Sequence, residues 1–122
     1  MGVPTSKRIR SRNDFRKIQS LSRHVFCKSF ICKYIFHLNG QPTNQRIGVI
    51  ASRRVGNAVK RNRGKRIFRE LFRIHEAKLP SNCDIIIILR SSYSNYTFEE
   101  LESHYIKACT VISQNRRIDQ NV

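Results

Sequence analysis

The chain has 122 residues, 39% of them hydrophobic, so one domain over residues 1–122 can bury a core and disorder is not expected. It carries 24 Lys or Arg against eight Asp or Glu, and residues 1–73 hold 19 of these cations with two acids. This one-sided excess, within a net charge of +16, predicts a polyanionic partner for the first part of the fold, with nucleic acid preferred over an anionic membrane surface.

The first segments are basic. Residues 1–10 are expected to form a flexible basic arm. The letters SRND (residues 11–14) resemble an N-cap followed by an acid in the first turn, which predicts a short helix over about Arg12–Ser20. This helix would turn Phe15 and Ile18 to one side.

Strand periodicity follows. From Val25 to Leu38 apolar side chains alternate with period two, leaving one apolar face and one mixed face that includes Ile31 and Lys33. The letters NGQPTNQ (residues 39–45) predict a turn. Residues 46–52 then predict a second strand, antiparallel to the first.

A second helix is predicted from about Ala58 to His75. Its apolar arc contains Gly64, Ile67, Phe68, Leu71, Phe72 and His75, and its opposite arc contains Asn62, Lys65, Arg66, Arg69 and Arg73. Like charges at these spacings repel by a few tenths of a kcal/mol per pair, so the cationic arc predicts contact with phosphates. A plain solvated helix face is the alternative. Gly64 on the apolar arc would admit a closely packed neighbour.

The last third of the chain is less charged. The run CDIIIILR (residues 83–90) is apolar without alternation, which predicts a strand covered on both faces. Thr97 and Glu100 form a capping box that opens a third helix to about Ser113. Residues 114–122 are expected to be a flexible tail.

The same sequence constrains the compartment. Its longest apolar run, Ile85–Leu89, is too short to span a membrane, so no membrane anchor is expected. No apolar signal core opens the chain. The four cysteines lie in apolar runs, which is typical of reduced, packed thiols. We therefore expect a cytoplasmic protein.

Catalytic and metal-binding patterns are weak. The four histidines form no acid–base pair, and Glu99, Glu100 and Glu102 lie in the first turns of a helix, where its dipole explains them. A zinc site at Cys27 and Cys32 is disfavoured because residues five apart on a strand point to opposite faces. No catalytic residue and no metal ligand is predicted on this chain.

The stretch SRRVGNAVKRNRGKRIFRE (residues 52–70) closely resembles the motif of the bacterial ribonuclease P protein subunits. The likeness extends from about Arg8 to Ile112. It implies an α+β fold, an α-β sandwich of αβββαβα order, whose four-stranded sheet contains a left-handed βαβ crossover around the second helix. General experience would instead favour a right-handed crossover.

The resemblance also implies a function. Such a subunit would bind the catalytic ribonuclease P RNA, one protein per RNA, and the single-stranded 5′ leader of precursor tRNA. The RNA would cleave the leader with magnesium that it mainly holds itself, while the protein would broaden substrate binding and reduce the magnesium demand. A ribosomal or other structural RNA-binding protein is the alternative, which the string GNAVKRNRGKR disfavours.

Two sets of site residues follow from the cationic arc and the resemblance. The predicted RNA-binding residues are Arg53, Arg54, Asn57, Lys60, Arg61, Asn62, Arg63, Lys65, Arg66, Arg69 and Arg73. The predicted leader-cleft residues are Phe15, Ile18, Ile31, Lys33 and Arg54. Members of the family often have an aromatic at the position of Gln19 and a tyrosine at that of Lys33. Gln19 and Lys33 offer no stacking platform, so leader contact at these two positions would lack the roughly 1–3 kcal/mol that stacking contributes per base.

Overall fold

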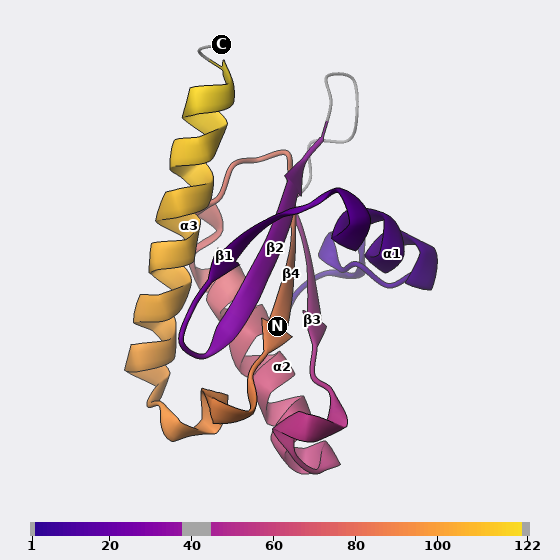
Figure 1. The fold of residues 1–122 in the computed structure, drawn as a ribbon, viewed down its shortest axis with the longest axis vertical. Coiled ribbons are helices and arrows are strands. Elements are labelled where there is room, and N and C mark those ends of the chain that lie inside the picture. Colours follow the sequence, from indigo (N-terminus) through magenta and orange to yellow (C-terminus); the bar gives the residue numbers. More distant parts are fainter. Residues whose placement is uncertain (1, 38–44, 121–122) are drawn as a thin grey trace.

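The computed structural model of the chain describes residues 2–37 and 45–120 (Figure 1). Its main elements are α1 (Arg12–Leu21), β1 (Arg23–Phe26), β2 (Phe30–Phe36), β3 (Arg46–Ile50), α2 (Ala58–Ile74), β4 (Cys83–Leu89) and α3 (Phe98–Gln120). This is the αβββαβα order implied by the resemblance. The predicted turn over residues 39–45 lies, except for Gln45, outside the described residues.

The four strands form one sheet in the order β1-β2-β4-β3. β2 pairs antiparallel with β1 and β4, whereas β3 pairs parallel with β4, so α2 connects two neighbouring parallel strands. The periodicity from Val25 to Leu38 predicts one strand, and this prediction is wrong. The segment contains β2 and the end of β1, which form a hairpin closed by the Cys27 amide, which donates to the Phe30 carbonyl at 2.9 Å. β3 does run antiparallel to β2, but β4 lies between them.

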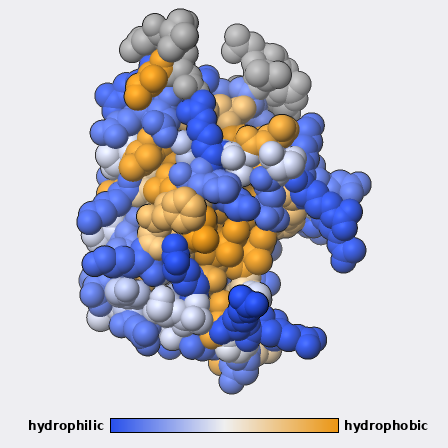
Figure 2. Space-filling model, viewed as in Figure 1, coloured by the Kyte–Doolittle hydropathy of each residue, from blue (hydrophilic) through white to orange (hydrophobic). Residues whose placement is uncertain are grey.

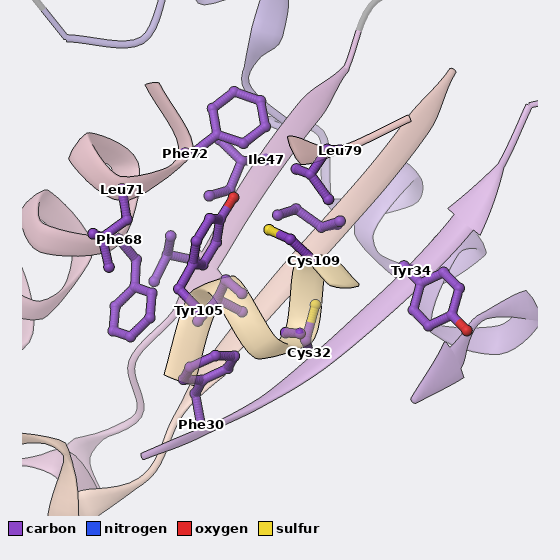
Figure 3. Close-up of a cluster of buried hydrophobic side chains, with 14 of the residues drawn as sticks. Phe30, Cys32, Tyr34, Ile47, Phe68, Leu71, Phe72, Leu79, Tyr105 and Cys109 are labelled. Atoms are coloured by element: carbon purple, nitrogen blue, oxygen red, sulfur yellow. The ribbon is translucent and has the colours of Figure 1, made fainter. Parts of the chain in front are cut away.

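The two faces of the sheet bury different helices. On one face, α2 and α3 cover the main core, where Phe68 and Leu71 of α2 meet Tyr105 of α3 and Phe30 of β2 (Figure 3). On the other face, α1 covers a smaller cluster around Ile86. β4 is therefore covered on both faces, as its unbroken apolar run predicts.

Close packing of α2 on the sheet depends on Gly64. A Cβ added there would lie 2.5 Å from Leu89 Cδ1 and 3.0 Å from Tyr93 Cζ, both closer than side chains pack. The predicted role of this glycine is confirmed.

No helix in the described part of the chain is both long and apolar enough to cross a membrane.

Residues 2–10 and 114–120, in the segments predicted as a flexible arm and a flexible tail, have defined contacts in the structure. The expected flexible arm is packed, because Val3 and Ile9 are only 4% and 5% exposed and the Ile9 amide donates to the Ile47 carbonyl at 2.9 Å. The expected flexible tail is helical as far as Gln120. Asn115 donates from Nδ2 to the Tyr34 hydroxyl at 2.5 Å, which ties this extension of α3 to β2.

Candidate nucleic-acid interface

The outer face of α2 carries the densest positive charge. Asn57 caps the helix, since its side chain accepts from the Lys60 amide at 2.9 Å. Asn62, Arg63 and Arg66 are exposed, while Lys65 and Arg69 are half-buried. The helix therefore divides into a cationic and a buried face along the lines that its periodicity predicts.

A groove of about 550 Å³ runs between α2 and the N-terminal segment. It is lined by Gly2, Val3, Arg8, Asn62, Lys65, Arg66, Arg69 and Glu70 and is called the basic groove below. Arg8 is held there because its Nε donates to the Val3 carbonyl at 2.9 Å. Burial and the positive charge of Arg8 lower the pKa of the Arg69 guanidinium. Such repulsion between converging cations is relieved by a bound anion.

Three other members of the predicted RNA-binding set have distinct settings. Arg73 forms an ion pair with Glu70, so part of its charge is already compensated. In the described part of the chain, the buried Nε of Arg61 has no hydrogen-bond partner. Lys60 packs its side chain beside Gly56, whose φ of 146° suits glycine in the turn before the helix.

The sheet face beside α1 forms a second surface. Here Ile31 of β2, Ile88 of β4 and Ile50 of β3 are half-buried and lie in one row across the sheet. Phe15 of α1 packs on Gly48, where a Cβ would come within 2.5 Å of its Cε1. Figure 2 shows an apolar floor in a hollow whose margins are hydrophilic. The row of isoleucines, with Phe15 and Lys33, is called the sheet cleft below.

The remaining predicted leader-cleft residues occupy different places. Ile18 is 2% exposed and packs with Ile9 and Ile86, so it supports the sheet cleft from within the core and does not line it. Arg54 is exposed in a short 3-10 helix, η2 (Arg53–Val55), which joins the cleft strand β3 to α2.

The two positions that depart from the family pattern meet in space. Lys33 donates from Nζ to Gln19 Oε1 at 3.4 Å, across the gap between β2 and α1. A polar pair thus stands at the two positions where the resemblance noted above leads us to expect aromatic rings. The pair can donate to phosphate or base oxygens, but it offers no stacking surface.

Sequence reasoning missed an ion-pair network that attaches α1 to the sheet. Asp84 is fully buried in β4 and accepts from Arg46 Nε at 3.0 Å and Nη2 at 2.6 Å. Arg46 also reaches Asp14 of α1 at 3.4 Å, and His37 lies 3.0 Å from Asp84. The hydrogen bond with Asp84 raises the pKa of Arg46. The sequence does contain one indication of this network. Asp84 is an acid inside an apolar strand, and a buried carboxylate requires a partner.

Comparison with known proteins gives a consistent result. A family model described as Ribonuclease P matches residues 3–113. The ribonuclease P protein component of Alkaliphilus metalliredigens is 32% identical over 91% of this chain and 100% of its own length. That of Staphylococcus haemolyticus is 32% identical over 88% of this chain and 93% of its own length.

Solved structures show the same fold. The ribonuclease P protein from Thermotoga maritima superposes with a TM-score of 0.76 at 28% identity, covering 86% of this chain and 96% of that one. A ribonuclease P protein from Staphylococcus aureus gives a TM-score of 0.76 at 28% identity, with coverage of 87% and 97%.

Proposed function

The chain belongs to the ribonuclease P protein family, and we propose that it holds the ribonuclease P RNA on its basic groove and the precursor tRNA leader in its sheet cleft. As a member, it is a subunit of the endoribonuclease that matures the 5′ end of tRNA, and the ribonuclease P RNA is its partner. One protein per RNA and a cytoplasmic location belong to the proposal. The latter is supported by four free cysteine thiols.

One observation supports this division of surfaces above others. The sheet cleft ends on β3, and η2 carries Arg53 and Arg54 directly from that strand to the cationic face of α2. A single strand in the cleft and a folded RNA on α2 would therefore meet along one cationic margin. Apolar floors with cationic margins suit unpaired nucleotides, whose bases and phosphates both need partners.

Magnesium belongs to the RNA in this proposal. Among the described residues, no three His, Cys, Asp or Glu side chains are grouped to hold a metal ion. In this proposal the RNA holds the magnesium, and the protein contributes positive charge. The protein's cations would reduce the repulsion between two RNAs, a task that metal ions otherwise perform.

Leader recognition is tested by comparing substrates. Holoenzyme reconstituted with a bacterial ribonuclease P RNA is expected to bind precursor tRNA more tightly than the RNA alone does, because the sheet cleft adds leader contacts. Mature tRNA, which has no leader, should gain little from the protein. Equilibrium binding with both substrates in non-cleaving calcium buffer measures the difference. An equal gain for both substrates would contradict leader binding.

The two faces of α2 are expected to respond differently to mutation. Arg66→Ala should weaken binding of the ribonuclease P RNA and lower the slope of log affinity against log salt by about 0.7–0.9, one phosphate contact. It should leave the thermal unfolding temperature nearly unchanged because the side chain is exposed. Leu71→Ala, on the buried face, should cost about 2–5 kcal/mol of folding stability. Unfolding by Arg66→Ala without a separate binding defect would refute the RNA contact.

A further inference from the structure

An aromatic ring is exposed at the edge of the sheet. Phe26, the last residue of the edge strand β1, is 69% exposed. Its neighbour Val25 packs against the core beneath α2 and α3, so Phe26 points to the opposite face, the one that α1 partly covers. The other Phe and Tyr residues of the four strands, Phe30, Tyr34 and Phe36, have the reverse parity and face α2 and α3.

The ring extends the floor of the sheet cleft. Phe26 pairs with Ile31, Ile31 with Ile88, and the parallel neighbour of Ile88 is Ile50. Cross-strand partners share a face, so these four side chains form one row. With strands about 4.8 Å apart, the row is about 14 Å long, enough for more than one stacked base.

The surroundings of the ring are suited to a nucleotide. The His24 and Phe26 rings are T-shaped, with centroids 5.9 Å apart and an interplanar angle of 82°, and Phe26 remains 69% exposed beside His24. Lys33 lies in the next row of the same sheet face, paired with His24. Among the strand residues that share this face, the one carboxylate is Asp84, which is buried against Arg46. The other aromatic ring on this side, Phe15, is packed on Gly48.

An apolar ring near the Lys33 ammonium, on a sheet face whose one strand carboxylate is paired with Arg46, favours a partner that has both flat apolar surfaces and negative charge. We propose that Phe26, flanked by His24, is a stacking platform for one unpaired nucleobase of the precursor tRNA leader, an inference that rests on the leader-binding function above. Stacking on aromatic side chains is tolerant of base identity, so the site would hold the strand without selecting its sequence.

Phe26→Ala in the reconstituted holoenzyme tests this platform. We expect affinity for leader-bearing precursor tRNA to fall by about five- to 150-fold, the range for loss of one stacked base, with affinity for mature tRNA unchanged. Phe26→Tyr keeps the ring and should restore binding. Phe98→Ala, which removes a 40% exposed ring at the start of α3, is the matched control and should bind like wild type. Thermal unfolding of each variant should match wild type.

Leader substrates with single abasic nucleotides locate the contact. At one position, removal of the base should weaken wild-type binding, and Phe26→Ala should cause no further loss there, since both changes delete the same interaction. Full additivity at every position, or an equal loss for mature tRNA, would overturn the platform. If the wild-type holoenzyme instead bound precursor tRNA and mature tRNA with equal affinity, the proposed leader-binding function itself would be refuted. The two failures are therefore distinguishable.

Discussion

Precursor tRNA incubated with the purified protein and magnesium is expected to remain uncut, and addition of a bacterial ribonuclease P RNA is expected to produce one cut that releases the 5′ leader. Hydrolysis of a phosphodiester near neutral pH requires groups that position metal ions or activate water. Gel analysis of end-labelled substrate measures both outcomes. This is the largest effect that we predict, because one condition should give no product.

The positions of the carboxylates explain why the protein alone is expected to leave the substrate uncut. Four of the eight acids form ion pairs with Lys or Arg, namely Asp14, Glu70, Glu76 and Asp84, and a fifth, Glu102, lies 2.8 Å from His75 Nε2. A sixth, Glu100, caps α3 by accepting from the Thr97 amide at 2.9 Å. These groups are distributed over the molecule and serve its fold. The cationic surfaces can instead position two RNAs.

Magnesium dependence provides a second measurement in the same assay. The RNA alone needs counterions to approach its substrate, and the protein's cations can replace part of them. The stimulation by protein should therefore be largest at low magnesium and decline as magnesium rises. Site-specific cleavage by a protein preparation shown to be free of RNA would refute the assignment of catalysis to the RNA.

The helices could be predicted from sequence where local rules agree with tertiary packing. In α2, the Asn57 cap and the spacing of Phe68, Leu71 and Phe72 all indicate the same boundaries and the same buried face. The α3 capping box of Thr97 and Glu100 is confirmed as well. The extension of α3 beyond Ser113 lacks apolar periodicity and depends on contacts with β2, which sequence reasoning could not supply.

Strand pairing was harder to predict because it depends on distant residues. The β1–β2 hairpin turns through Cys27–Ser29, which lacks the Gly, Pro or Asn that usually marks a turn. The insertion of β4 between β2 and β3 depends on pairing across α2, which no local pattern encodes. The basic groove was missed in part for the same reason. Ordering of Arg8 beside α2 depends on burial of Val3 and Ile9.

The buried ion pair between Arg46 and Asp84 leads to the largest predicted loss of stability. Among the described residues, Arg46→Ala would leave His37 as the side-chain partner of the fully buried Asp84 carboxylate, and removal of one partner from a buried pair costs about 3–5 kcal/mol. Urea unfolding at neutral pH should show this loss as a lower midpoint. Asp14→Asn, which changes only the half-exposed end of the network, should cost about 0–1 kcal/mol.

A double variant separates charge burial from packing in the same experiment. Arg46→Met combined with Asp84→Leu replaces the pair by apolar side chains, and such replacements are often neutral or stabilising. The double variant should therefore be more stable than Arg46→Ala, although α1 loses its attachment to β3 through Asp14. Because α1 forms a wall of the sheet cleft, the double variant should bind leader-bearing precursor tRNA more weakly than wild type, even if its stability recovers. A double variant less stable than Arg46→Ala would show that the network stabilises the fold by its specific geometry, and not by neutralising a buried charge.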